Sequence, residues 1–287
     1  GRASVDKLLA RYPKAQHLQD IQSSNVFFFT FTLRIMGLLP CDVVSLYMGA
    51  TGADFWPYLG GGMLGFLPLI GVLVGACEYG WLLLAGKLAV SGLLYAAGAV
   101  LIPVVITGGI HLDGFVDTCD ALCSYGDREK RLEILKDPHV GAFAILWIGV
   151  LLVAQLGLFA QIYETPASAK LLLFGYAGAR ALGGGMIVTQ TCAKNSGLAH
   201  LFADNADKKR VSRVMLVWEL VLAVLAIVLA KGIGALAVAA CAVFYVLHVR
   251  MCRKNFGGIT GDLCGMCITV CETVTLLCAV IGGMALR

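Results

Sequence analysis

Three aspartates follow directly after an apolar run long enough to cross a bilayer. They are Asp113, Asp117 and Asp120, within the segment 108–120. A charge near lipid is costly in free energy unless it pairs with an opposite charge or serves a function. On a helix these spacings place the three carboxylates within about 60° of one another. A divalent cation would offset their repulsion, and an oxygen-only cluster suits magnesium or manganese better than zinc. The alternative is a solvated helix start, where acidic residues are favoured, although a cap needs only one of the three.

The densest charge in the chain comes next, at 124–141. An ordinary solvated loop and helix is one interpretation, and it suits the glutamates of this segment. Its cations Arg128, Arg131 and Lys136 could instead bind phosphate oxygens. Carboxylates that hold a metal, followed by basic residues, indicate phosphoryl transfer, in which the protein positions groups and absorbs charge.

Four further charges lie in apolar or glycine-rich surroundings: Arg180, Lys194, Asp262 and Glu272. Lys194 adds a cation beside a glycine. For Arg180, direct contact with substrate and structural pairing with a buried carboxylate both remain open. Asp262 begins the last apolar segment, where a simple helix cap is the alternative. Glu272 lies inside that segment with no local partner.

His111 and His139 flank the acidic region and could serve as general bases. Neither has a partner that the sequence reveals, so a hydrogen-bonding role is favoured for both. His111 is retained as a substrate-binding candidate.

The composition indicates an integral membrane protein. Of 287 residues, 59% are hydrophobic and 14% are charged, and the mean hydropathy is +0.84, whereas soluble domains are about 25% charged. The 35 glycines with only 7 prolines are typical of close helix packing in membranes. A net charge of +4 is too small to indicate a nucleic-acid partner. We therefore expect an all-α, polytopic helix bundle.

Seven apolar runs have the length of a membrane span, about 20 residues. They are 60–84, 88–108, 140–163, 170–192, 213–231, 233–250 and 265–286. An eighth run, 25–48, is interrupted by Arg34, and if it crossed, the basic N-terminus and the later basic loops would lie on opposite sides. We therefore predict about seven transmembrane helices plus an N-terminal re-entrant or interfacial segment.

This topology predicts a single membrane domain over 1–287, with a cytoplasmic amphipathic segment at 1–24 and a helical bundle at 25–287. No removable signal peptide is expected. Three polar segments, 109–139, 193–213 and 250–264, would share the cytoplasmic face. The eleven cysteines are interpreted as small packing residues in a reducing compartment, because no histidine pair accompanies them to complete a zinc site.

Four motifs in this order resemble the signature of the cobalamin synthase family, the adenosylcobinamide-GDP ribazoletransferases. They are Phe66-Leu67-Pro68-Leu69-Ile70-Gly71; Gly108-Gly109-Ile110-His111-Leu112-Asp113-Gly114 with Asp117 and Asp120; Leu135-Lys136-Asp137 running into Val140-Gly141-Ala142-Phe143; and Gly257-Gly258-Ile259-Thr260-Gly261-Asp262 with Gly265 and Glu272.

The resemblance implies a magnesium-dependent, multi-pass enzyme of the bacterial inner membrane, active on the cytoplasmic face. It would join adenosylcobinamide-GDP to α-ribazole or its 5′-phosphate and release GMP. The implied metal ligands are Asp113, Asp117 and Asp120. Lys136 and Asp262 join them as catalytic candidates, and the substrate-binding candidates are His111, Arg128, Asp137, Arg180, Lys194 and Glu272.

Two other classes of protein remain open. A CDP-alcohol phosphotransferase or an intramembrane prenyltransferase also uses aspartates at helical spacing with magnesium, although a prenyltransferase should carry two acidic motifs of similar density. A transporter would use intramembrane carboxylates and inverted repeats, and no such repeats are evident. The expected partners are small-molecule substrates and membrane lipid, and the oligomeric state stays open.

Overall fold

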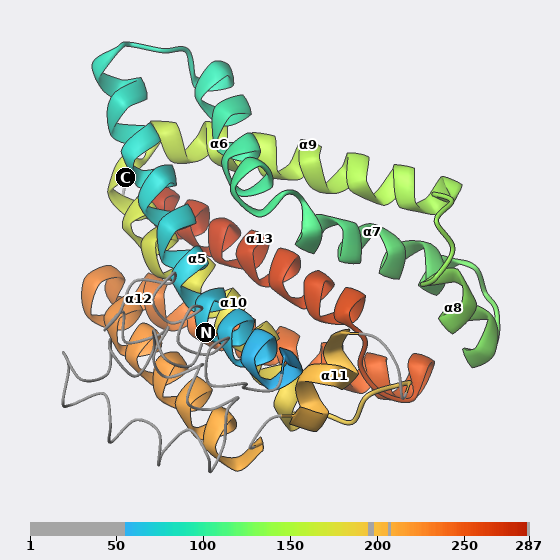
Figure 1. Cartoon of the computed structure of the whole chain (residues 1–287). Coiled ribbons are helices and arrows are strands. Elements are labelled where there is room, and N and C mark those ends of the chain that lie inside the picture. Colours follow the sequence, from blue (N-terminus) through green and yellow to red (C-terminus); the bar gives the residue numbers. More distant parts are fainter. Residues whose placement is uncertain (1–54, 195–197, 206–207, 286–287) are drawn as a thin grey trace, which may run out of the picture.

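The computed structural model describes residues 55–194, 198–205 and 208–285 (Figure 1). Every regular element in these ranges is helical, which confirms the predicted all-α class. The elements are α5 (Phe55–Lys87), α6 (Gly92–Thr107), α7 (Ile110–Cys123), α8 (Arg128–Ile134), α9 (Ala142–Glu164), the 3-10 helix η2 (Pro166–Leu171), α10 (Leu172–Thr189), α11 (Leu198–Asn205), α12 (Lys208–Phe256) and α13 (Gly261–Ala285). The segments predicted at 1–24 and 25–48 lie outside the described residues.

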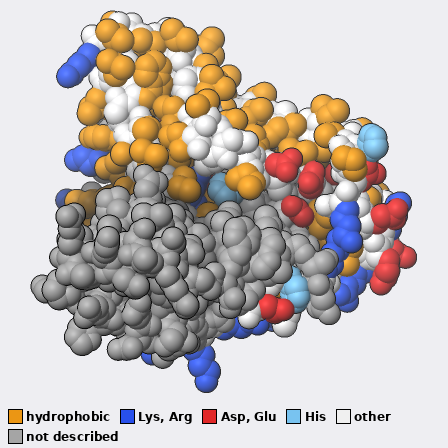
Figure 2. Space-filling model, in the orientation of Figure 1, with side chains coloured by type: hydrophobic (Ala, Val, Ile, Leu, Met, Phe, Trp, Pro, Cys, Tyr) orange, Lys and Arg blue, Asp and Glu red, His pale blue; other side chains and the backbone are white. Residues whose placement is uncertain are grey.

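Five helices in the described ranges are long and apolar enough to cross a membrane, or six if the bent pair α6 and α7 is counted as one span. The polytopic helical architecture is therefore confirmed, whereas the count of seven spans remains a prediction. Apolar side chains cover much of the surface formed by α5, α6 and α9 (Figure 2). Exposed residues such as Leu83, Val105 and Val153 are as expected of a surface that faces lipid.

The helix α12 is interrupted at Lys231, whose backbone is non-helical (φ 50°, ψ −128°). A Cβ built on Gly234 would lie 2.0 Å from the carbonyl oxygen of Ala226. Residues eight apart are about 12 Å apart along a straight helix, so the chain must turn back sharply here. The runs predicted at 213–231 and 233–250 meet at this turn.

A second bend separates α6 from the acidic helix α7. The two helices are inclined at 97°, and the connection consists of Gly108 (φ 64°) and Gly109 (φ 76°), both left-handed. Glycine adopts this backbone region without the steric cost that other residues incur. The glycine pair therefore ends the apolar helix and redirects the chain so that the aspartates run along one end of the bundle.

Close packing against α13 fixes the position of α7 (Figure 1). A Cβ on Gly114 would lie 2.6 Å from the carbonyl oxygen of Asp262, and one on Gly265 would lie 3.2 Å from the carbonyl oxygen of His111. Small residues let two helix backbones approach this closely. The two glycines therefore bring the acidic motif and the late glycine-rich motif into contact.

The ten cysteines in the described part of the chain are all free. Half of them are buried in α12 or α13: Cys252, Cys264, Cys267, Cys271 and Cys278. Such burial fits the interpretation of these cysteines as packing residues.

Candidate active site

Acidic side chains gather over α7 on one face of the molecule (Figure 2). Asp113 is exposed and Asp117 is half-buried one turn later. Neither makes an ion pair with a basic residue among those the structure describes. Asp113 also lines an open groove of about 610 Å³ together with Gly109 and Ile148. Both carboxylates are thus accessible, and no basic side chain in the part of the chain that the structure describes forms an ion pair with either.

Asp262 extends this acidic edge from a second helix. It lies in the first turn of α13, packed against Gly114, and accepts a hydrogen bond from Thr260 Oγ1 at 3.3 Å. Asp117 interacts electrostatically with Asp113, Asp262 and Asp120. Four carboxylates from two distant parts of the sequence therefore share one electrostatic environment.

The carboxylates present fit a magnesium ion that takes only some of its ligands from the protein and the others from the substrate. Among the described residues, no three His, Cys, Asp or Glu side chains converge on one point as a complete protein site would require. Magnesium is usually bound by one or two carboxylates plus water and substrate phosphates. Asp113 and Asp117, one turn apart on α7, are the two carboxylates that could serve as the protein's ligands to such an ion.

Asp120 differs from its two neighbours. A Cβ on Gly141 would lie 2.2 Å from either carboxylate oxygen of Asp120, so this carboxylate packs against the residue that precedes α9. Gly141 has no side chain with which to cap that helix. A negative charge is favourable at a helix N-terminus, so Asp120 lies where its charge would stabilise α9, a location that the sequence did not reveal.

The three polar segments predicted to share one face do meet at one end of the bundle. Ala193 N donates to Ile259 O at 2.8 Å, and Ile259 N donates to Thr191 O at 2.9 Å. A Cβ on Gly258 would lie 2.5 Å from Thr191 O, so only glycine fits this pairing. Lys194 Nζ donates to Leu132 O at 2.6 Å. The loop before α13, the loop after α10 and helix α8 are thereby joined.

A basic pocket opens beside this junction. Its volume is about 250 Å³, and its lining includes Lys136, Lys194, His200 and Asp262. Burial, together with the nearby charge of Lys136, lowers the pKa of Lys194, while the charge of Asp262 acts in the opposite direction. Asp262 therefore belongs both to the acidic edge and to the lining of the basic pocket.

Two other candidates in this region are held by local contacts. Asp137 is exposed and accepts hydrogen bonds from His139 N at 2.9 Å and the His139 ring at 2.7 Å, which lower the pKa of its carboxyl. The guanidinium of Arg128 packs against Gly257. Its neighbour Arg131 donates to Asn255 Oδ1 at 2.6 Å. The helix α8 is thereby attached to the end of α12.

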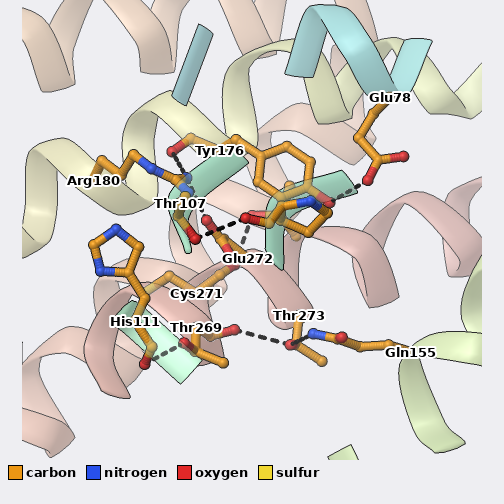
Figure 3. A network of polar contacts seen from close by, with 12 residues as sticks. Glu78, Thr107, His111, Gln155, Tyr176, Arg180, Thr269, Cys271, Glu272 and Thr273 are labelled. Atoms are coloured by element: carbon orange, nitrogen blue, oxygen red, sulfur yellow. Dashed lines mark hydrogen bonds and ion pairs between the residues drawn. The ribbon is translucent and has the colours of Figure 1, made fainter. Parts of the chain in front are cut away.

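Arg180 and Glu272 pair with each other in the interior (Figure 3). Their side chains are 1% and 11% exposed, and Arg180 Nη1 also donates to Tyr176 O at 3.0 Å. Both residues line a cavity of about 30 Å³ with His111. His111 O in turn accepts a hydrogen bond from Thr269 Oγ1 at 3.0 Å. This buried network lies behind the first turn of α7.

Comparison with known proteins identifies the family. A family model described as cobalamin-5-phosphate synthase matches residues 29–280. The chain belongs to the cobalamin-5-phosphate synthase family. The resemblance inferred from the four motifs is thus confirmed, and so is the prediction of an enzyme.

Curated relatives agree over most of the chain, and each is named adenosylcobinamide-GDP ribazoletransferase. The protein of Lachnoclostridium phytofermentans is 36% identical over 75% of this chain and 82% of its own length. A Clostridium botulinum relative is 34% identical over 76% and 86%, and a Pseudomonas syringae relative is 32% identical over 87% and 97%. No solved structure matches the chain.

Sequence reasoning missed several residues of this synthase-family chain that the structure places near the site. His200 lines the basic pocket, and Tyr176 OH donates to Glu78 Oε1 at 3.3 Å at the inner end of the buried network. Glu78 could have been found, because it is a carboxylate within an apolar helix, as Glu272 is. His200 gave no such signal, since its place depends on loops that are distant in sequence.

Proposed function

We propose that this chain is a magnesium-dependent transferase that joins adenosylcobinamide-GDP to α-ribazole or α-ribazole 5′-phosphate, with release of GMP. One observation carries the proposal beyond family membership. Asp113 and Asp117 are accessible, pair with no described basic residue and share an electrostatic environment with Asp262, which lines a pocket with Lys136 and Lys194. Carboxylates that can hold a metal, next to cations that can bind phosphate, suit phosphoryl transfer.

In this reaction an acceptor hydroxyl attacks the phosphorus nearer the corrinoid. The new bond forms as the bond from that phosphorus to the bridging oxygen breaks, and GMP leaves with the bridging oxygen. Asp262 belongs to the acidic edge and also lines the basic pocket, and we assign it the role of accepting the hydroxyl proton. The groove of about 610 Å³ beside Asp113 is open, so part of the large corrinoid donor could lie in it with the rest outside.

Asp113 and Asp117 would hold the magnesium ion, which when bound supplies positive charge to the diphosphate oxygens. Arg128, Lys136 and Lys194 would add cations at the same end of the bundle. The excess of basic residues in these loops supports a cytoplasmic location for this face, and the relatives' bacterial sources support the inner membrane.

We assign Arg180 and Glu272 an indirect role, in which they position the substrate through neighbouring parts of the protein. Their charges pair with each other, although the buried Arg180 Nε has no hydrogen-bond partner among the described residues, and the pair lies against the small cavity that includes His111. The pair would hold the first turn of α7 in place, and with it Asp113. Asp137, which is exposed, would contact the substrate at the rim of the site, and His111 would act on it from the small cavity behind the first turn of α7.

The test is reconstitution of the purified full-length chain in liposomes with GDP-cobinamide, α-ribazole 5′-phosphate and magnesium. We expect GMP release that requires both substrates and stops when magnesium is chelated. Parallel reactions with a CDP-alcohol and with a prenyl diphosphate serve as comparisons. Turnover of either compound, without GMP release from GDP-cobinamide, would contradict the proposal.

A further inference from the structure

The N-terminus of the acidic helix α7 has little support from its own sequence. The helix follows two left-handed glycines, and its N-cap, Gly109, has no side chain to accept a hydrogen bond from the first turn. The first N–H groups of a helix need such partners, and uncapped helix ends fray. Asp113 lies in this first turn. Contacts with other helices are therefore needed to fix the position of its carboxylate.

The last helix, α13, supplies one such contact as a hydrogen bond. Thr269 Oγ1 donates to His111 O at 3.0 Å (Figure 3). Within the described ranges this is the only hydrogen bond between α7 and another helix. Thr269 is 3% exposed, so its hydroxyl has few alternative partners. The bonded carbonyl belongs to the same turn of α7 as Asp113.

The glycine one turn before Thr269 brings the two backbones together at this point. A Cβ on Gly265 would lie 3.2 Å from His111 O and 3.4 Å from Gly114 Cα. Residues four apart on a helix share a face, so Gly265 and Thr269 both face the start of α7. Close packing of small residues allows the helices to approach, whereas a hydrogen bond has a defined distance and direction. The hydroxyl therefore adds the specificity of register that the glycine alone does not.

A second pair of hydrogen bonds ties this part of α13 to α9 (Figure 3). Gln155 Nε2 donates to Thr273 Oγ1 at 2.9 Å, and Thr273 Oγ1 donates to Thr269 O at 2.9 Å. The helix α9 packs against both α7 and α13. Side-chain hydrogen bonds of this kind hold helices together within membranes. A chain of hydrogen bonds thus runs from α9 through α13 to the first turn of α7.

We propose that Thr269 is a positioning residue for Asp113 and Asp117, whose hydroxyl fixes α7 on α13 in the register that magnesium binding requires. The inference rests on the proposed function and deepens it. Asp113 follows the bonded carbonyl by two residues, which is about 3 Å along the helix, so a shift of the first turn displaces its carboxylate. Asp262 lies on the same helix as Thr269, so the bond also sets the distance between Asp113 and Asp262. Thr269 acts through the two helices and does not touch the substrate.

The test is the magnesium requirement of Thr269→Val, which removes the hydroxyl and keeps a side chain of similar shape. The magnesium concentration that gives half-maximal GMP release is measured for the full-length chain in liposomes with GDP-cobinamide and α-ribazole 5′-phosphate. It should rise about 3- to 20-fold, the range that corresponds to hydrogen bonds between membrane helices. At saturating magnesium, kcat should change less than about twofold, because both carboxylates remain.

Two further variants separate positioning from general stability. Thr269→Ser keeps the hydroxyl and should need magnesium within about twofold of wild type. Thr275→Val is the matched control, because Thr275 is 4% exposed on the same helix and its hydroxyl donates within that helix, to Cys271 O at 2.9 Å. It should match the magnesium requirement of wild type, even if its unfolding midpoint falls as far as that of Thr269→Val.

Hydrogen exchange of the backbone amides tests the contact without turnover. The exchange of residues 110–117 is measured in detergent without magnesium. Exchange reports local opening of a helix, so these amides should exchange faster in Thr269→Val than in wild type, Thr269→Ser or Thr275→Val.

An unchanged magnesium requirement in Thr269→Val would overturn the inference, and so would unchanged exchange of the first turn of α7. An equal rise in the magnesium requirement of Thr275→Val would show a general effect of lost stability and would overturn it as well. Failure of the proposed function gives a different result, in which wild type releases no GMP. The exchange measurement still tests the contact in that case.

Discussion

The two polar regions of this molecule treat their charges in opposite ways. At the end of the bundle, Asp113 and Asp117 are accessible and unpaired among the described residues, and Lys136 has no acidic partner. In the interior, Arg180 and Glu272 are almost fully buried and satisfy each other. An unpaired charge can bind a ligand, whereas breaking a buried ion pair has a high cost in free energy. The contrast supports the proposal that the first region binds the substrate and that the second region positions the first.

The largest effect is expected for Asp117→Asn. Loss of one electrostatic contribution to transition-state stabilisation costs about 10²- to 10³-fold in kcat, and the thermal unfolding midpoint should stay near that of wild type because Asp117 is only half-buried. The rate of GMP release and the midpoint are measured on the same preparation. Glu129→Gln, an exposed change on α8, is the control. If Asp117→Asn lost stability as well as turnover, the accessible region would also support the fold, and the contrast with the buried region would fail.

Breaking the buried pair should act on stability first. Replacing Glu272 with Leu leaves the Arg180 charge buried without a partner, which costs about 3–5 kcal/mol. The double variant Arg180→Met/Glu272→Leu should recover much of that loss, because no unpaired charge remains. Unfolding in detergent measures both. A single variant as stable as wild type would show that the pair does not support the fold.

Gly114→Val should separate the two helices that build the acidic edge. The added side chain would collide with the backbone of Asp262, which is 2.6 Å from a Cβ at this position. Overpacking costs about 1–3 kcal/mol, and displacement of α7 should also lower the rate of GMP release. Gly149→Val on α9, where nothing lies within 4 Å, is the matched control. Equal behaviour of the two variants would argue against the close contact.

The smallest effect is expected for Asp120→Asn. Its carboxylate packs against Gly141 at the start of α9, where a negative charge contributes about 0.3–1 kcal/mol. We therefore expect a small loss of stability and a much smaller loss of turnover than in Asp117→Asn. If turnover falls as far as in Asp117→Asn, Asp120 belongs with the metal ligands, as the acidic motif alone suggested.

Periodic and compositional features could be predicted from the sequence. The long apolar runs predicted helices close to those observed, for example 140–163 against Ala142–Glu164. The acidic motif and the late glycine motif were both recognised, and the grouping of the polar segments followed from the distribution of basic residues. These features depend on local residue patterns, which the sequence states directly.

Contacts between distant segments could not be predicted in the same way. Arg180 and Glu272 are 92 positions apart, and nothing near either residue indicates the other. The contact of Asp120 with Gly141 depends on how α9 returns to α7, and the turn at Lys231 depends on packing of the two halves of α12. The basic pocket is likewise formed by three separate loops. Such features follow from helix packing, which a single sequence does not specify.

The most direct test of this account is a parallel measurement of GMP release by Asp113→Asn and Glu272→Gln, each normalised to folded protein. Glu272→Gln keeps an acceptor for Arg180 and nearly the same volume. The account predicts that Asp113→Asn loses magnesium-dependent turnover while its unfolding midpoint is unchanged, and that Glu272→Gln is less stable yet retains turnover per folded molecule. Near wild-type turnover by Asp113→Asn would contradict it.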